Sequence, residues 1–224
     1  MSNKQNFRVF NDIAKKYTLK GCSLDVFSLI LSFTRDNKQC SYSQETLSSL
    51  LGYNRSSINI AIHDLKSKGL IQETESVYES KSWIATNKLV AFSKNCKNHF
   101  YNRSIERIKY FNKEKINHSR QIVFDIIQAY EDADLICTRK AIKQNYVYSN
   151  QTLCDSISDL LKLGLIQEKK HKGKCRSYII SKNILSPAES RRRSDLTSNS
   201  TPTSSESKNV AFESLEECLK KCME

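Results

Sequence analysis

Residues 53–73 read YNRSSINIAIHDLKSKGLIQE, and residues 148–168 read YSNQTLCDSISDLLKLGLIQE. The two stretches align without a gap at a constant offset of 95 residues. A repeat of this kind indicates that one supersecondary unit occurs twice in the chain. The similarity continues upstream after a shift of two residues, so we expect two units of about 70 to 80 residues each. The identical positions in the first copy are Tyr53, Ile62, Asp64, Leu65, Gly69, Leu70, Ile71, Gln72 and Glu73.

Each unit is expected to contain three helices. In the first unit, apolar residues recur at helical spacing over 24–31 and again over 58–65, which predicts the first and third helices. Ser43 precedes a short amphipathic stretch that ends at Gly52, so we expect an N-capped second helix between them. Gly69 follows the third helix and is expected to end it as a C′ residue.

A pair of antiparallel strands is expected after the third helix of each unit. In the first unit, Leu70 begins an extended stretch, and the chain is expected to return near Trp83. In the second unit, residues 169–176 read KKHKGKCR. This run predicts a basic hairpin that turns at Gly173, with residues 178–180 forming the returning strand.

The order of these elements points to a known family. Residues 43–71 read SQETLSSLLGYNRSSINIAIHDLKSKGLI and closely resemble the winged helix-turn-helix family of plasmid and phage replication initiators and bacterial regulators. The resemblance covers residues 24–73, whereas the second unit retains mainly its third helix and wing. Val147 stands where the first unit has Gly52, which leaves the geometry of that turn open.

The resemblance implies a mainly α fold with small β-wings, an α+β class with two tandem winged helix-turn-helix domains. In this family the second helix of the motif enters the major groove of DNA. Between the two units, residues 94–120 carry eight basic and two acidic side chains, which suit a helix along phosphates or a helix that packs the units together. The expected segments are a helical extension at 1–20, winged helix domains at 21–93 and 118–185, a basic connector helix at 94–117, a disordered linker at 186–208 and an amphipathic helix at 209–224.

The distribution of charge favours nucleic acid as the partner. The 224 residues carry a formal net charge of +12. Residues 186–224 contain six basic and seven acidic side chains, so the excess positive charge lies in the first 185 residues. Lysine and arginine displace counterions from phosphates, which makes double-stranded DNA the expected partner.

Several classes of protein are excluded by what the sequence lacks. The five glycines form neither a P-loop nor G-x-G-x-x-G, and the four histidines form no metal motif. The eight cysteines include no C-x-x-C pair. The apolar run at 26–31 is too short to cross a bilayer, and residues 1–10 lack a signal core. We therefore expect no enzyme activity, no cofactor, no metal and no membrane partner, and a cytoplasmic, nucleoid-associated protein.

The third helix of the first unit carries the residues expected to read DNA. Its face opposite the apolar stripe holds only uncharged or basic side chains. Arginine reads guanine, asparagine reads adenine and serine adapts to either base, whereas helix N-termini and turns hold phosphates. The alternative is an ordinary solvated helix face. The expected DNA-binding residues are Ser43, Gln44, Tyr53, Asn54, Arg55, Ser56, Ser57, Asn59 and His63.

The second unit is expected to contact DNA mainly through its hairpin. Asp155 on its third helix would repel phosphate. Leu161 and Leu163 replace Lys66 and Lys68 of the first unit, and this apolar stripe requires a cover, either the other unit or a second chain in a homodimer. The expected DNA-binding residues are Thr138, Arg139, Ser149, Asn150, Gln151, Thr152, Lys169, Lys170, Lys172, Lys174 and Arg176.

Two functional classes follow from these expectations. The first is a replication initiator that binds origin repeats and recruits a replication protein through residues 209–224. The second is a transcriptional regulator that binds promoter DNA, with a transcription protein docking on the same segment. An adaptor in which one unit only pairs with proteins is a third class, and residues 209–224 could also fold back onto the body of the protein.

Overall fold

The computed structural model describes residues 6–75, 81–95, 100–170 and 176–181. Within these ranges the chain is mainly helical with small two-stranded antiparallel sheets, which confirms the α+β class. The expected linker at 186–208, the expected helix at 209–224 and the expected turn at Gly173 lie outside the described residues.

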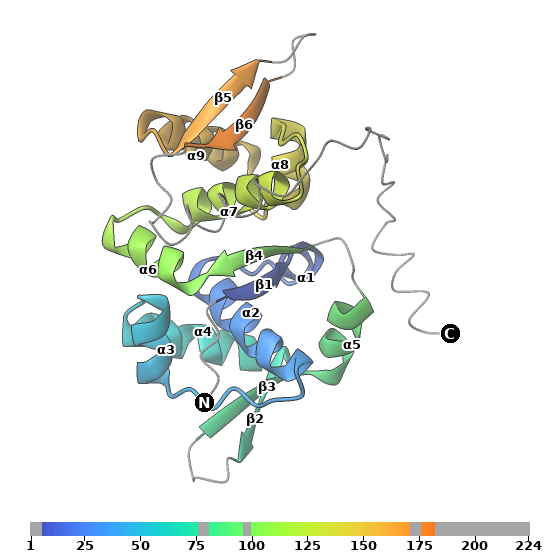
Figure 1. Ribbon diagram of the computed structural model, residues 1–224. Helices are drawn as coiled ribbons and strands as arrows, with labels where there is room; N and C mark the ends of the chain where they lie inside the picture. Colours follow the sequence, from blue (N-terminus) through green and yellow to red (C-terminus); the bar gives the residue numbers. More distant parts are fainter. Residues whose placement is uncertain (1–5, 76–80, 96–99, 171–175, 182–224) are drawn as a thin grey trace, which may run out of the picture.

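Both units show the predicted order of three helices followed by a strand pair (Figure 1). The first unit comprises α2 (Gly21–Arg35), α3 (Gln44–Leu51), α4 (Arg55–Ser67), β2 (Ile71–Glu75) and β3 (Lys81–Ala85), followed by α5 (Asn87–Asn95). The second unit comprises α7 (His118–Asp132), α8 (Arg139–Asn145), α9 (Asn150–Lys162), β5 (Ile166–Lys170) and β6 (Arg176–Ile180). The first hairpin returns near Trp83, as predicted, with Glu73 opposite Trp83, and in the second hairpin Glu168 lies opposite Tyr178.

The repeat in the sequence is also a repeat in the structure. Helix α9 and strands β5 and β6 begin and end 95 residues after α4, β2 and β3, and α7 lies 97 residues after α2. The N–H of Trp83 donates to the carbonyl of Cys40 at 3.0 Å, and the N–H of Tyr178 donates to that of Cys137 at 2.9 Å. Because these cysteines are also 97 residues apart, the two-residue shift lies in the loop between each cysteine and the next helix.

The helix ends follow the expected glycines where these are present. Gly69 and its equivalent Gly164 have φ of +65° and +68°, a left-handed conformation that ends α4 and α9. Gly52 ends α3 with φ of +69°. In the second unit α8 ends instead at Tyr146, whose backbone is extended (φ −102°, ψ 136°), so the turn without the glycine takes a different path.

The N-terminal segment differs from the predicted helical extension at 1–20. It forms strand β1 (Asn6–Phe10) and only a short helix, α1 (Asn11–Lys16). Phe7 and Val9 are buried, whereas Asn6 and Arg8 are exposed. This alternation is typical of a strand with one face toward the core and the other toward solvent. This period of two belongs to a strand, whereas a helix would bury residues at a period of 3.6.

The connector predicted as one helix over 94–117 is also corrected. It contains strand β4 (Phe100–Ser104) and then helix α6 (Ile105–Lys113). Strand β4 pairs antiparallel with β1, with Val9 opposite Tyr101. Of the basic residues in this segment, Arg103 lies in β4 and is fully buried, whereas Arg107, Lys109 and Lys113 lie in α6.

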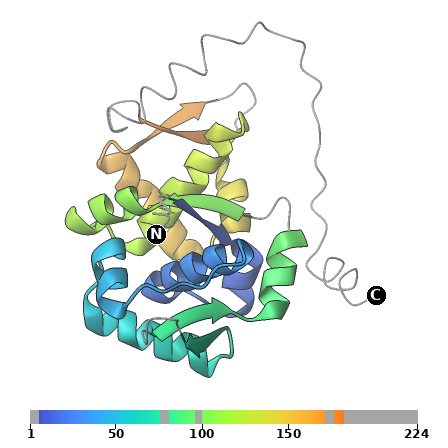
Figure 2. The same cartoon turned by 60° about the horizontal axis from the view of Figure 1, so that its bottom comes forward.

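Strands β1 and β4 occupy equivalent places in the two units. Each strand precedes a short helix and then the first long helix of its unit. When two equivalent strands pair antiparallel, they are related by an approximate twofold axis, as two subunits are in a symmetric dimer. Figures 1 and 2 show this strand pair between the two units, with hairpins β2–β3 and β5–β6 at opposite ends of the molecule. The two units are therefore arranged like the halves of a dimer.

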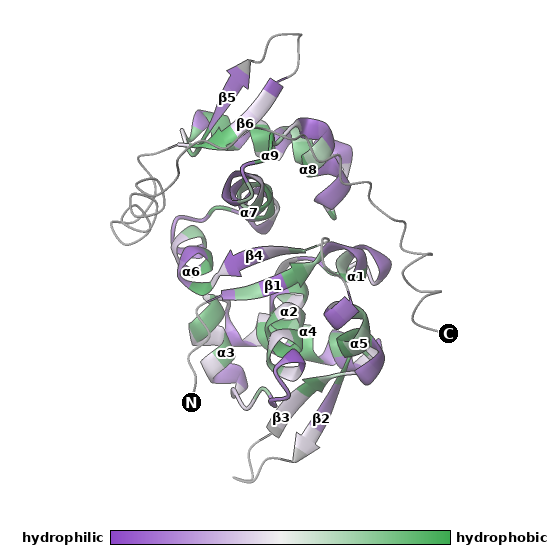
Figure 3. Ribbon diagram, turned by 45° about the vertical axis from the view of Figure 1, so that its right-hand side comes forward, coloured by the Kyte–Doolittle hydropathy of each residue, from purple (hydrophilic) through white to green (hydrophobic). Residues whose placement is uncertain are grey.

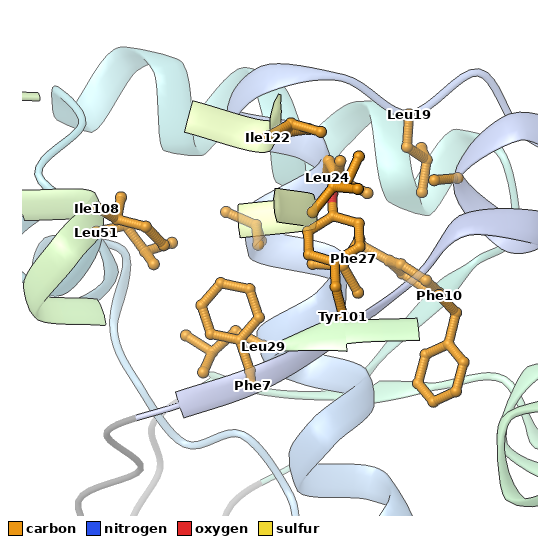
Figure 4. Close-up of a cluster of buried hydrophobic side chains, with 14 of the residues drawn as sticks. Phe7, Phe10, Leu19, Leu24, Phe27, Leu29, Leu51, Tyr101, Ile108 and Ile122 are labelled. Atoms are coloured by element: carbon orange, nitrogen blue, oxygen red, sulfur yellow. The ribbon is translucent and has the colours of Figure 1, made fainter. Parts of the chain in front are cut away.

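One continuous apolar core joins the two units. Figure 4 shows Phe27 and Leu29 of α2 close to Tyr101 of β4, with Ile122 of α7 nearby. The ring of Phe111 on α6 packs edge-on against Phe124 of α7, with centroids 5.2 Å apart. In Figure 3 hydrophobic residues concentrate on the elements at the centre of each unit, and hydrophilic residues lie on outer elements such as β5.

Candidate nucleic-acid interface

Helix α4 has one buried face and one exposed face. Ile58, Ala61, Ile62 and Leu65 are buried, as predicted. The side chains on the opposite face are exposed; they are Arg55, Ser56, Asn59, Ile60, His63 and Lys66. None of these is a carboxylate, and the carboxylate of Asp64, which flanks this face, pairs with Lys68 at 2.8 Å. Such a face presents hydrogen-bond donors and positive charge without the repulsion that a carboxylate would cause near phosphates.

The first residue of each second helix contacts the exposed face of the following helix. Gln44 Nε2 donates to Asn59 Oδ1 at 3.3 Å. At the equivalent positions of the second unit, Arg139 Nη2 donates to Cys154 Sγ at 2.6 Å. These contacts bring Gln44 beside the residues of α4 that were expected to read bases, and they orient Arg139 along α9.

Four of the predicted site residues are N-caps. Asn54 Oδ1 accepts from the N–H of Ser57 at 2.7 Å, and Ser43, Thr138 and Ser149 cap α3, α8 and α9 in the same way. A capping side chain typically contributes about 1 kcal/mol to stability. In the structure these residues therefore stabilise helix N-termini, and a phosphate contact would be a second role.

The position of Tyr53 differs from the prediction. Its hydroxyl donates to Asp25 Oδ2 at 2.8 Å, and the side chain of Asp25 is fully buried. The phenol therefore points into the protein, whereas a hydroxyl that binds phosphate would have to point outward.

The corresponding face of α9 is less suited to DNA. Asn150 and Gln151 are exposed, but Gln151 Nε2 donates to Asp155 Oδ1 at 2.9 Å. Thr152, the third predicted residue here, is partly buried. Leu163, part of the apolar stripe noted in the sequence, is 55% exposed, whereas Leu161 packs against the core.

The hairpins differ in charge as the sequence predicts. Lys169 is exposed on β5 beside Lys170 in the same strand, and Arg176 on β6 pairs with Glu168 at 3.1 Å. Lys172 and Lys174 lie outside the described residues. In the first hairpin, Glu73 binds Lys66 of α4 at 2.7 Å, so this carboxylate offsets a basic charge at the end of the exposed face.

Ile60 belongs to the exposed face but was not among the predicted site residues. Its side chain is 68% exposed, which is unusual for a large apolar residue on a helix that buries its other isoleucines. An apolar side chain next to Asn59 could contact the methyl group of thymine. The signal in the sequence is that Ile60 does not share the helical spacing of the buried residues, which are Ile58, Ala61, Ile62 and Leu65.

A buried ionic network between the units was also missed. Arg103 of β4 contacts Asp25 of α2, pairs through Nε with Asp125 of α7 at 2.9 Å and donates to Gln121 Oε1 at 2.7 Å. The side chains of Arg103 and Asp25 are fully buried. His118 Nε2 lies 2.8 Å from Arg103 Nη1 and 3.3 Å from Asp25 Oδ1. The signal in the sequence is an aspartate inside the apolar run of the first helix.

The charges of this network follow from burial and from the ion pairs. Burial raises the pKa of Asp25, but Arg103, His118 and the hydrogen bond from Tyr53 together outweigh burial and hold that pKa below its usual value. For Asp125 burial prevails over Arg103 and Arg107, so its pKa is raised. Burial likewise lowers the pKa of His118, so the imidazole favours its neutral form.

The neutral state of His118 predicts a loss of stability on mild acidification. In the unfolded chain a histidine has a pKa of about 6.5, whereas the native site resists protonation, so the free energy of unfolding falls below this pH. The loss is about 1.4 kcal/mol for each unit by which the pKa is lowered. In His118→Gln this contribution is absent.

Urea unfolding at pH 7 and pH 5 measures this effect. The free energy of unfolding of the original protein should decrease relative to that of His118→Gln as the pH falls. A difference between the two proteins that stays the same at both pH values would contradict the prediction.

In the part of the chain that the structure describes, no group of three or more His, Cys, Asp or Glu side chains could hold a metal ion. None of the described helices has the length and apolar character needed to cross a membrane.

Comparison with known proteins yields no match to this chain, either among protein-family models or among curated proteins.

Proposed function

We propose that the protein is a sequence-specific binder of double-stranded DNA in which the two units act as tandem winged helix-turn-helix domains. In each unit the second and third helices would form the helix-turn-helix, and the following hairpin would be the wing. Helix α4 would enter the major groove and the basic hairpin β5–β6 would contact phosphates or the minor groove.

The observation that carries the proposal is the exposed face of α4. Arg55, Ser56 and Asn59 lie on it without a carboxylate, at the N-terminal half of the third helix. In helix-turn-helix proteins these N-terminal residues contact base edges. The positive charge of +12 supports the same partner, because it favours association with polyanions.

Selection of bound sequences from a random pool of duplexes tests this proposal. The full chain should enrich a defined site, and the enriched duplex should bind at least about 1,000-fold more tightly than an unrelated duplex at physiological salt. Failure to enrich any sequence would reject sequence-specific binding.

The favoured biological role is replication initiation at an origin with repeated sites, and the second candidate is transcriptional regulation. The arrangement of two units with a C-terminal segment at 209–224 that could recruit a partner favours the initiator. Several copies of the selected site next to an origin in the source genome would support initiation. A single site at a promoter would instead support regulation.

Ile60 provides a prediction about individual bases. If its side chain contacts the methyl group of a thymine, replacing that thymine by deoxyuridine should weaken binding about fourfold, since burial of one such group contributes about 0.8 kcal/mol. In Ile60→Ala the same base replacement should have no effect. The measurement is titration of each selected duplex, with thymines replaced one at a time. Equal affinity for every substituted duplex would exclude a methyl contact by Ile60.

A further inference from the structure

Two repeated tyrosines end in the same buried network. Tyr53 and Tyr148 are equivalent residues, and each directly precedes the N-cap of a third helix, α4 or α9. The hydroxyl of Tyr53 donates to Asp25 Oδ2 at 2.8 Å. The hydroxyl of Tyr148 lies 2.8 Å from His118 Nδ1 and accepts from the N–H of Gly21 at 3.3 Å.

These contacts form a continuous path between the two turns. From Tyr53 it passes through Asp25 to His118, at 3.3 Å, and from His118 to Tyr148. Arg103 closes a second branch, because it contacts both Asp25 and His118. Asp25 belongs to the first unit and His118 to the second, so the path crosses from one unit to the other.

A second pair of contacts lies at the ends of the second helices, just before the turns that contain Tyr53 and Tyr148. Asn112 of α6 donates through Nδ2 to the carbonyl of Leu51 at 2.9 Å, at the end of α3. Lys15 of α1 donates to the carbonyl of Gln144, near the end of α8. Lys15 and Asn112 are 97 residues apart, as α2 and α7 are, so residues at equivalent positions contact the end of the second helix of the other unit.

We infer that Tyr53 and Tyr148 are positioning residues that fix the distance and orientation between α4 and α9. The inference rests on the proposed function and specifies it. A single chain would then select DNA sites whose two halves, one contacted by α4 in the major groove and one contacted by the β5–β6 hairpin next to α9 in the minor groove, lie at one fixed separation. Neither tyrosine would contact a base.

The rigidity of this path explains why the protein would discriminate between DNA sites by the spacing of their two halves. One added base pair moves the two halves of a site apart by about 3.4 Å and rotates one about the axis. A protein could follow such a change only by moving one unit against the other. Hydrogen bonds are lost well within such a displacement, and with them the contacts of both tyrosines.

The double variant Tyr53→Phe/Tyr148→Phe tests the inference, because it removes both hydroxyls and retains both rings. Tyr146→Phe is the matched control. Its hydroxyl is also buried, but it bonds to Ser119 and Ser156 within the second unit. Loss of stability alone would therefore affect the control as well.

The first measurement needs no DNA. Spin labels on non-natural residues at the exposed equivalent positions Ser56 and Gln151 report the distance between α4 and α9. The distribution of distances should be narrow in the original protein and in Tyr146→Phe, and broader in the double variant. Equal widths in all three proteins would overturn the inference, whether or not the protein binds DNA.

The second measurement uses the selected duplex and versions with one or two base pairs inserted or deleted between its protected halves. The original protein and Tyr146→Phe should lose about tenfold in affinity, the scale of one or two hydrogen bonds. The double variant should lose less than about threefold. A broader distance distribution combined with the original spacing profile would also overturn the inference, while absence of binding to every duplex would reject the proposed function instead.

Discussion

Replacing Arg103 with methionine is expected to lower the free energy of unfolding by about 3–5 kcal/mol, because removal of one partner from a buried ion pair leaves the other charge uncompensated. Here two buried carboxylates, Asp25 and Asp125, would lose their shared guanidinium. Arg107 would still pair with Asp125 at 2.8 Å, so the larger penalty falls on Asp25. Denaturant unfolding of Arg103→Met measures the loss.

Lys68→Met is the control for this prediction. Lys68 pairs with Asp64 at 2.8 Å, but both side chains are more than a third exposed, and exposed pairs contribute only about 0–1 kcal/mol. A triple variant, Asp25→Leu/Arg103→Met/Asp125→Leu, should recover part of the lost stability, since apolar residues can replace a buried ionic group. Loss of less than about 1 kcal/mol in Arg103→Met would show that the network contributes little to stability.

Arg55→Ala is expected to have the largest effect on DNA binding, a loss of about 1–3 kcal/mol with relaxed preference at one base pair. Arg55 is the first residue of α4 and its side chain is exposed. A guanidinium in this place can bind O6 and N7 of guanine together, and no alanine contact replaces these bonds. Titration of the selected duplex and of its single-base-pair variants measures both the loss and the change in preference.

Lys169→Gln separates base reading from charge. Lys169 is exposed on β5, where a phosphate contact carries no information about sequence. This variant should weaken binding to all duplexes alike and reduce the slope of log affinity against log salt by about 1. If Arg55→Ala behaved in the same way, with preference unchanged at every position, α4 would not read bases through Arg55.

The sequence predicted the parts of the fold that depend on local patterns. The helical spacing over 58–65 and the glycine after it predicted α4 and its end at Gly69, and the repeat predicted the equivalent elements of the second unit. Strands β1 and β4 were missed because each is short and becomes stable only through pairing with the other, about 94 residues away. Such pairing leaves little trace in a local window of sequence.

Only the part of the candidate site that depends on local sequence patterns could be predicted. Residues on the exposed face of α4 follow from helical periodicity alone, and the structure places Arg55, Ser56 and Asn59 on that face. The inward direction of Tyr53 depends on Asp25, 28 residues earlier, and the burial of Arg103 depends on both units. An arginine in a basic segment gives no indication that it will be enclosed between two carboxylates.

The pairing of β1 with β4 has a consequence for synthesis of the chain. Strand β1 comprises Asn6–Phe10, and its partner comprises Phe100–Ser104. During translation at about 5–20 residues per second, several seconds separate the appearance of the two strands. Throughout this interval the nascent first unit has an open strand edge and an aspartate whose arginine has not yet been made. The first unit therefore completes its contacts only after β4 has been made, and until then the unpaired edge of β1 is open to pairing with another chain.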